Sequence, residues 1–409
     1  MKTPITCLLL TAVAVCAISA ESKPNAHGIN TFGLELHQRL AKEGGNIVAS
    51  PWSIQSALAM TYAGAAGKTR EEMAAALHFG DDEKALHARF AAIADDLADL
   101  VKKSKNQAER SKQHGGTSTP LEITTANRLF GNENFTFENP FLTLLKKSYA
   151  APLETMDFVS APEPSRKHIN DWIAGQTKDR IKDLIPAGAI NPDTRLILAN
   201  AIYMKAAWQE EFTKEADSPF FVNGTEAVKL PSLVKQRLFG YLKIPGGAIV
   251  AVPYADQGLQ FLIMVPDEKD GLSTMEKTLT ADLLQQAASA ENREILLHFP
   301  KFKLEPPSIA LADHLSAMGM PSAFKQGTAD FSLMASEPLS ISQVVHKGFI
   351  AVDEYGAEAA AATAVIMQRT SRALPATPLE IRVDRPFAFA IQHTKSGTCL
   401  FLGRVTDPR

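Results

Sequence analysis

The sequence predicts a mixed α+β protein, and three observations support this fold class. Apolar residues in the first third of the chain recur with helical spacing between cap and stop signals. After residue 120, short apolar segments typical of strands take over, with a helical stretch among them. The chain has 409 residues, of which 45% are hydrophobic, so it can fill a large core and is not a disordered protein. This length suggests two or three domains, although some large sheet-based folds form a single unit.

The N-terminal segment has the pattern of a secretory signal peptide. Lys2 precedes an apolar stretch at residues 5–18, and the small residues Ser19 and Ala20 come before polar sequence. The apolar stretch is too short for a comfortable membrane span, which argues against a retained anchor. We therefore expect residues 1–20 to be removed and the protein to be secreted, extracellular or periplasmic, without a membrane partner.

Cysteine content and net charge exclude further classes of protein. Cys7 and Cys16 fall in the expected leader, so Cys399 stands alone in the mature chain and has no partner for an internal disulfide. Its apolar neighbours favour a buried small hydrophobic side chain over a reactive thiol. A net charge of -3 argues against a dedicated nucleic-acid binder.

Helix signals come first along the chain. Ser50 followed by proline is a cap residue with proline at the first helical position. Thr69 and Glu72 have the spacing of a capping box, which predicts a helix that ends at Gly80. A further helical pattern occupies residues 82–100.

The rest of the chain is predicted to consist mainly of strands. They lie at 121–130, 196–203, 249–265, 295–302, 339–352 and 387–405, with one helix around residues 168–184. The runs within 249–265 are continuously apolar, as in strands that are buried on both faces. Two segments are expected to be exposed connections, 102–120 and 356–378.

The common sequence signatures of catalytic and metal sites are missing. Residues 64–69 resemble a phosphate-binding loop, but Tyr62 stands where its first glycine is needed, and the segment follows a helix. His-Glu-x-x-His, paired Cys-x-x-Cys and Gly-x-Ser-x-Gly do not occur. We therefore assign no catalytic residue, no metal ligand and no cofactor. A dispersed Ser/His/Asp triad, as in a secreted hydrolase, stays open as the enzyme alternative.

An alanine-rich segment at residues 354–372 needs an explanation of its own. By propensity, residues 358–364 form a short helix, which is one interpretation. The other is a loop that is exposed in one state and becomes a strand inside a sheet in another, because small side chains lose little entropy and fit between existing strands. Period-two alternation supports this second interpretation. It puts Glu358 on one face, and on the other only small uncharged residues: Ala357, Ala359, Ala361 and Thr363.

A series of motifs in the same order resembles the serpin family over essentially the whole mature chain. They lie at 46–54 (NIVASPWSI), 125–130 (TANRLF), 169–172 (INDW), 199–205 (ANAIYMK), 300–302 (PKF), 329–332 (ADFS), 384–387 (DRPF) and 401–403 (FLG). The resemblance implies one α+β domain at 21–409, with three β-sheets, about nine α-helices and an exposed reactive-centre loop at about 355–378.

The resemblance also implies a function, which is protease inhibition without catalysis by this chain. A target serine protease, or a cysteine protease, attacks the loop and forms an acyl-enzyme, and the cut loop then inserts into the main sheet and traps the enzyme. Three groups of residues match the family's working parts. The hinge is Glu354, Gly356, Ala357, Glu358, Ala359, Ala360, Ala361, Ala362 and Thr363, with Gly356 as pivot. The polar shutter beneath the sheet is Ser50, Ser53, Asn200 and His346. The breach, where insertion begins, is Trp208 with the surface ion pair of Lys301 and Glu354.

The position of the reactive bond is left open. Counting sixteen residues past Glu354, as in the family, places the bond between Thr370 and Ser371. A loop one residue shorter is cut after Arg369, and a longer one after Arg372. An arginine at the bond favours trypsin-like proteases, which we slightly prefer as targets because two arginines flank the counted position.

Other features receive the simpler interpretation. The basic run in residues 102–112 is interpreted as a solvated helix end and linker, not as a glycosaminoglycan site. Asn134 and Asn223 begin Asn-x-Thr sequons, which matter only in a eukaryotic source. We expect a monomer. A non-inhibitory serpin, acting as a chaperone or carrier, is the alternative, although such proteins normally carry bulky or charged hinge residues.

Overall fold

The computed structural model describes residues 26–116, 118–222, 224–357 and 377–409. The helices in this part of the chain are α1 (Ala26–Leu40), α2 (Pro51–Tyr62), α3 (Gly67–Ala76), α4 (Glu83–Gln113), α5 (Asn139–Tyr149), α6 (Pro162–Gln176), α7 (Leu272–Glu276), α8 (Ala281–Ala287) and α9 (Ala312–Ala317). The strands are β1 (Ile47–Ala49), β2 (Glu122–Asn132), β3 (Glu154–Met156), β4 (Leu196–Ala207), β5 (Thr213–Val222), β6 (Glu226–Ile244), β7 (Gly247–Pro253), β8 (Leu259–Pro266), β9 (Asn292–Pro300), β10 (Phe302–Leu304), β11 (Ile309–Ala310), β12 (Gln343–Gly348), β13 (Ile350–Val352), β14 (Gly356–Ala357), β15 (Leu379–Arg382), β16 (Phe387–His393) and β17 (Thr398–Val405). The predicted α+β class is confirmed.

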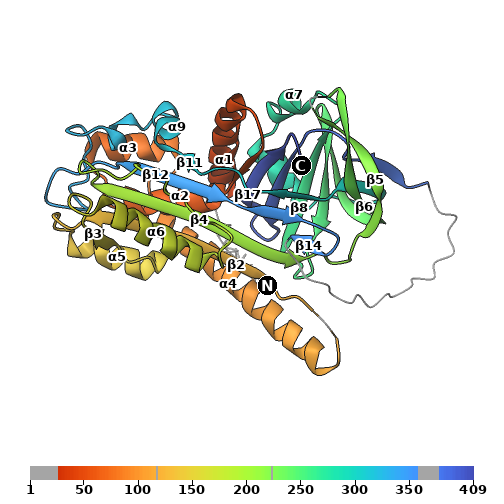
Figure 1. Cartoon of the computed structure of the whole chain (residues 1–409), viewed down its shortest axis with the longest axis horizontal. Helices are drawn as coiled ribbons and strands as arrows, with labels where there is room; N and C mark the ends of the chain where they lie inside the picture. The colour runs from red at the N-terminus through yellow and green to blue at the C-terminus, as the bar shows by residue number, and fades with distance from the viewer. Residues whose placement is uncertain (1–25, 117, 223, 358–376) are drawn as a thin grey trace, which may run out of the picture.

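The main sheet has the order β10-β13-β14-β4-β12-β11, and β2 and β3 extend it from the side of β4. Its core is the antiparallel pair of β2 and β4, which runs from Glu122 opposite Lys205 to Gly131 opposite Leu196. β12 pairs with β4 in parallel. Figure 1 shows β4 and β12 crossing the molecule side by side.

A second network of nine strands forms the other half of the molecule. Its order is β1-β17-β16-β8-β7-β6-β9-β15, with β5 also paired to β6. The long strand β6 pairs with β5 through its first half and with β7 through its last five residues, so it joins two of the three predicted sheets into one hydrogen-bonded network. β8 and β17 are buried along their whole length, as their apolar sequences predict.

Alternate residues of β4 face two different helical layers. Leu198 and Ile202 belong to the large core cluster that contains Trp52 and Leu58 of α2. Ile197, Ala199, Ala201 and Tyr203 belong to a separate cluster with α6 and the segment that follows that helix. The main sheet is therefore covered by α2 on one face and by α6 on the other, as period-two alternation requires.

Two local predictions are wrong. The capping box does not form, because α3 begins at Gly67 without a side-chain cap, while Thr69 Oγ1 accepts a hydrogen bond from the distant backbone N–H of Asp330. Glu72 likewise accepts a hydrogen bond from the backbone N–H of Ser322. The segment 102–120 was expected to be a connection, but it is helical as far as Gln113. It belongs to α4, which is 31 residues long in all and reaches away from the sheets (Figure 1).

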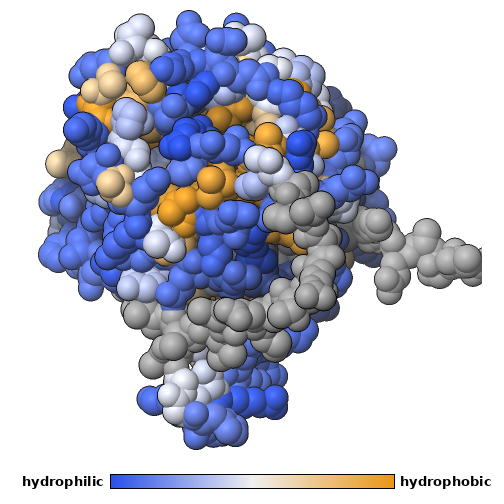
Figure 2. All heavy atoms as spheres, turned by 90° about the vertical axis from the view of Figure 1, so that its right-hand side faces the viewer, coloured by the Kyte–Doolittle hydropathy of each residue, from blue (hydrophilic) through white to orange (hydrophobic). Residues whose placement is uncertain are grey.

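The surface of the described chain is largely polar at the end that carries β5 and β6. Figure 2 shows this end as mostly hydrophilic with small apolar patches. Large hydrophobic side chains that are clearly exposed are confined, within the described residues, to Val159, Leu238 and Leu333. In the same residues, the helices are too short or too polar to cross a membrane.

Candidate functional site

At one end of the main sheet, β4 and β13 are not paired with each other, and the two-residue strand β14 lies between them. Over residues 343–348, β12 pairs directly with β4. Beyond this point β13 and β4 are separated by β14, whose Ala357 is opposite Val352 of β13 and Ala206 of β4. β14 is antiparallel to both neighbours. The hinge sequence therefore enters the sheet at a gap that closes a few residues further on.

Gly356 allows the chain to enter this gap. Its φ is 154°, and a Cβ atom at this position would lie 2.0 Å from the backbone oxygen of Ala206. A side chain cannot be accommodated there unless β14 or β4 moves. Ala357, the next residue, is 2% exposed and packs in the large core cluster. Residues 358–363 of the hinge, and the candidate reactive-bond residues 369–372, lie outside the described residues, as does the expected leader at 1–20.

The breach residues meet directly above this gap. Trp208 donates from its backbone N–H to the oxygen of Tyr355, and from its indole Nε1 to the oxygen of Asp353, both at 2.9 Å. Its ring stacks on Tyr254, with centroids 4.7 Å apart and planes within 9°. The indole thereby fixes the turn from β13 into β14.

Glu354 is held by two lysines, not by one. Its Oε2 atom lies 2.9 Å from Nζ of Lys301, and its Oε1 atom lies 2.8 Å from Nζ of Lys214. The expectation of a surface ion pair is wrong for the carboxylate, whose side chain is 6% exposed. Burial alone raises the pKa of Glu354, but the hydrogen bonds from Lys214 and Lys301 outweigh it and lower the pKa to about 2. Lys214, on β5, was not identified from the sequence.

The four expected shutter residues are brought together where α2 begins beneath the sheet. Asn200 of β4 is in register with His346 on one side and with Asn127 of β2 on the other, so three polar side chains form a row across three strands. Asn200 Nδ2 donates to Ser53 Oγ at 2.7 Å, and Ser53 Oγ donates to Asn127 Oδ1 at 3.1 Å. Ser50 caps α2, as its sequence predicts, by accepting from the backbone N–H of Ser53.

His346 links β12 to the start of α2 in one protonation state. The backbone N–H of Ser50 donates to its Nε2 atom at 3.1 Å, so the ring proton is on Nδ1, which donates to Asn200 Oδ1. Complete burial lowers the pKa of His346 to about 3. Protonation of Nε2 would set two donors against each other, so this site requires the neutral ring.

Asn127 contacts the expected shutter residues, although the sequence did not indicate it. It was recognised only as part of the motif at 125–130, without a role. The signal that identifies it is structural, namely its register with Asn200 and its contact with Ser53.

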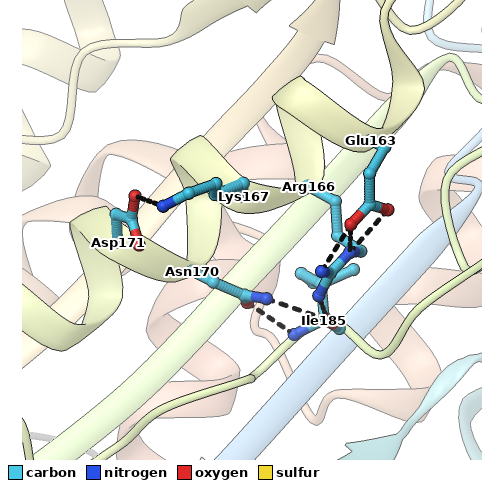
Figure 3. A network of polar contacts seen from close by, with 6 residues as sticks. All are labelled: Glu163, Arg166, Lys167, Asn170, Asp171 and Ile185. Atoms are coloured by element: carbon cyan, nitrogen blue, oxygen red, sulfur yellow. Dashed lines mark hydrogen bonds and ion pairs between the residues drawn. The ribbon is translucent and has the colours of Figure 1, made fainter.

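The layer that covers the other face of the main sheet consists of α6 and the segment after it, and hydrogen bonds join these two parts. Figure 3 shows Asn170 of α6 and the backbone of Ile185 exchanging two hydrogen bonds, at 2.9 and 2.8 Å, while Arg166 donates to the same carbonyl oxygen. Lys347 of β12 donates to the backbone oxygen of Lys182 in the same covering segment. The covering segment is therefore bonded to β12 as well as to α6.

Within the described residues, His, Cys, Asp and Glu do not gather into groups of three that could hold a metal ion. Cys399 is fully buried, and this burial raises the pKa of its thiol to about 12. The thiol is therefore protonated at neutral pH and unsuited to nucleophilic chemistry.

Comparison with known proteins agrees with this geometry. The model of the serpin family, described as serine protease inhibitors, matches residues 27–408. "Serpin B6" of Pongo abelii is 38% identical over 394 residues, which cover 94% of this chain and 99% of that protein. "Leukocyte elastase inhibitor" of Equus caballus is 36% identical over 401 residues, which cover 95% of this chain and 99% of that protein.

Solved structures show the same fold. Serpin48 of the insect Tenebrio molitor superimposes with a TM-score of 0.78 at 27% identity, covering 95% of this chain and 100% of the other. Uncleaved ovalbumin gives a TM-score of 0.77 at 25% identity, covering 94% and 100%. The chain belongs to the serpin family. This family is one of protease inhibitors, not of enzymes.

Proposed function

We propose that this serpin inhibits serine endopeptidases by a suicide mechanism, in which the segment between β14 and β15 is the bait. The observation that carries the proposal is the position of β14, which already occupies the mouth of the gap between β4 and β13. Continuation of the same strand toward β12 would separate six register pairs between β4 and β12. The hinge would enter by lengthening an existing antiparallel strand.

The chemistry belongs to the protease. Its serine oxygen attacks the carbonyl carbon on the N-terminal side of the reactive bond, and the amide nitrogen leaves with a proton as a new amino terminus. The acyl ester then joins the protease to the end of the hinge segment. Insertion of that segment before water reaches the ester would carry the enzyme along and distort its active site.

The driving force comes from strand pairing. Insertion would replace one parallel ladder, between β12 and β4, with two antiparallel ladders, one on each side of the new strand. Each added backbone hydrogen bond contributes about 0.5–1.5 kcal/mol net, and burial of the inserted side chains adds to this gain, against a cost of about 1–2 kcal/mol for each backbone residue that is ordered.

The reactive bond is proposed at Thr370–Ser371 or directly after Arg369 or Arg372. An arginine would select trypsin-like proteases, and threonine would select elastase-like or subtilisin-like ones. Residues 1–20 are proposed as an export signal, and 21–409 as the mature single domain, acting outside the cell or in a periplasm as a monomer. An N-terminus that retains the first residues after expression in the natural host would contradict the export proposal.

Two other classes remain as alternatives. A non-inhibitory serpin would be cut without forming a complex, and the small hinge residues Ala357 and Ala359 to Ala362 argue against it. A hydrolase would turn over ester or peptide substrates, which the family does not support.

The experiment is incubation of the purified chain with a panel of trypsin-like, elastase-like and subtilisin-like proteases. A band at the summed mass that survives denaturant is the expected result for at least one of them. Mass spectrometry of the released C-terminal peptide then identifies the reactive bond. Cleaved product without any complex, across the whole panel, would contradict the inhibitory mechanism.

A further inference from the structure

The strand β15 attaches the C-terminal end of the proposed bait segment to the second strand network. Among the described strands it is paired with β9 alone, in parallel, from Leu379 opposite Ile295 to Arg382 opposite His298. The next residue, Val383, continues this attachment, because its backbone N–H donates to the oxygen of His298 at 2.9 Å. We call residues 379–383 the C-terminal anchor. An edge strand this short makes few backbone hydrogen bonds, so side-chain contacts contribute a large part of its attachment.

The side chain of His298 lies between carboxylates from two other strands. Its Nδ1 atom is 2.9 Å from Oε2 of Glu215 on β5, and its Nε2 atom is 3.5 Å from Oε1 of Glu380 on β15. The imidazole is 10% exposed, and Nε2 has no hydrogen-bond partner in the part of the chain that the structure describes. The contact between His298 and Glu380 therefore depends on charge and not on a strong hydrogen bond.

A neutral imidazole does not suit this arrangement. It has one N–H group, so one ring nitrogen directs a lone pair at a carboxylate, whichever tautomer is present. With the proton on Nδ1, which the shorter contact with Glu215 favours, the lone pair of Nε2 faces Glu380. The imidazolium ion has a donor on each nitrogen and attracts both carboxylates. The charged ring thus links β9 to β15 as well as to β5.

The charge of His298 is the one near Glu380 that changes at neutral pH. The other side chains around the ring are one cation, one anion and four uncharged residues: Arg382, Asp384, Ser232, Val234, Leu296 and Pro300. A terminal nitrogen of Arg382 lies 2.5 Å from the same oxygen of Glu380, but arginine keeps its charge at all these pH values. Asp384 is paired with Arg385 at 2.7 Å. A proton on His298 therefore adds a second cation to Glu380.

We propose that His298 is a proton-dependent positioning residue for the C-terminal anchor of the bait segment. Histidine side chains in general change their charge between about pH 5 and 8, where carboxylates stay ionised. The protonated ring holds β15 to β9, and deprotonation loosens it. Attachment of the anchor therefore takes up protons, so it is tighter at pH 6 and weaker at pH 8.

The anchor is tested on the full uncut chain by hydrogen exchange. Peptides that contain residues 379–383 are compared at pH 6 and pH 8 as protection factors, which removes the intrinsic effect of pH on exchange. The wild type should show about threefold to tenfold more protection at pH 6, the effect of one partly screened ion pair. His298→Gln and Glu380→Gln should each abolish this difference. Equal protection at both pH values in the wild type, or a difference that persists in both variants, overturns the proposal.

His168→Gln is the matched control. Its Nε2 atom also contacts a glutamate, at 2.7 Å from Oε1 of Glu154, but His168 lies on α6 in the layer over the main sheet. This variant should keep the pH difference at the anchor. Loss of the difference here as well indicates a general effect of pH and overturns the assignment to His298. If His298→Gln does not fold, Glu380→Gln gives the same test, because that side chain is 48% exposed.

The consequence for inhibition rests on the proposed function. A chain segment that is fixed at both ends loses less conformational freedom when a protease binds it. The rate of covalent complex formation is therefore compared between wild type and His298→Gln, with the same protease at pH 6 and pH 8. The ratio of the two rates cancels the protease's own dependence on pH, and it should be about threefold at pH 6 and near one at pH 8.

The two measurements fail separately. A rate ratio that is equal at both pH values overturns the link between the anchor and inhibition. If protection of the anchor changes with pH but no protease forms a complex, the proposed function fails while the anchor stands. If complexes form but protection does not change with pH, the role of His298 fails alone.

Discussion

His346 and Asn200 are register partners across β12 and β4, and Nδ1 of His346 donates a hydrogen bond to Oδ1 of Asn200. The pair therefore joins the two strands by side chains at the place where the proposed insertion would separate their backbones. His346 also accepts from the backbone N–H of Ser50, so the same ring joins the sheet to α2. The neutral imidazole therefore acts beside the hydrogen bonds from Asn200 and Asn127 to Ser53, which also join the sheet to α2.

We predict that His346→Phe destabilises the uncut protein by about 2–4 kcal/mol, because the Ser50 N–H and the Asn200 oxygen are left buried without partners. The pH dependence gives a sharper signature. The unfolded chain protonates His346 near its ordinary value of 6.5, whereas the folded chain does so only at about pH 3. Stability from this group is complete above pH 6.5 and is lost as the pH falls toward 3. Urea denaturation at pH 7.5 and pH 5 should therefore show a smaller difference in the variant than in the wild type.

Glu354 differs from His346, because it is a buried group that stays charged. Removing either Lys214 or Lys301 leaves the carboxylate with one partner, and removing both leaves it buried and unpaired. The double variant should therefore lose more stability than the sum of the two single variants, measured as shifts of the urea midpoint. Additive shifts would indicate that the lysines act only as surface charges.

The same carboxylate predicts an acid transition. The pKa of Glu354 falls from an ordinary value of 4.5 to about 2 in the folded chain, so its contribution is complete above pH 4.5 and is lost as the pH falls toward 2. Glu354→Gln should be less stable at neutral pH and should show a flatter stability profile between pH 4.5 and 2. A profile parallel to that of the wild type contradicts the assignment.

These residues show how far sequence reasoning reaches in this protein. The Ser50 cap and the apolar strands depend on neighbouring residues, and they were predicted correctly. Thr69 and Glu72 had the right spacing for a local capping box, but they are engaged by Asp330 and Ser322 from far along the chain. Lys214 lies on β5, in a segment that the sequence left unassigned, so its contact with Glu354 had no local signal. Polar networks between distant strands are set by register, which a residue pattern does not contain.

Gly356 provides a test of the hinge entrance. Gly356→Ala puts a Cβ atom against the backbone of Ala206 and should cost about 1–3 kcal/mol of uncut stability or displace β14 from the gap. Insertion would then begin from a less advanced position, so more inhibitor molecules should be cleaved per protease trapped. Gly175→Ala is the matched control, because a Cβ atom there meets nothing within 4 Å and should stabilise α6 by about 0.5–1 kcal/mol or less. If both variants are cleaved in equal number per protease trapped, Gly356 has no role in the inhibitory step.

Cutting the loop with a protease that is not trapped should raise the melting temperature. A newly inserted strand adds on the order of 5–10 kcal/mol through backbone hydrogen bonds and burial, which corresponds to roughly 6–12 °C for a chain of this size. Calorimetry before and after the cut measures the change. Unchanged melting temperatures mean that the cut loop stays outside the sheet.

The last prediction tests the alternation of the hinge. Ala357 is already buried between β4 and β13, so a charge at this position would disturb the uncut fold as well as the insertion. Thr363 shares its parity and is therefore the better position for a test of insertion. Thr363→Arg should fold normally but should bury an unpaired charge on insertion, at a cost of several kcal/mol. Hydrolysis of the acyl-enzyme should then overtake insertion, and the variant should behave as a substrate.

Glu358→Gln, of opposite parity, is the control and should inhibit as the wild type does. The measurement is the stoichiometry of inhibition against one protease for both variants, together with their melting curves before cleavage. If Thr363→Arg inhibits as efficiently as Glu358→Gln, the strand does not reach residue 363, because a buried arginine without a partner cannot be accommodated at so small a cost.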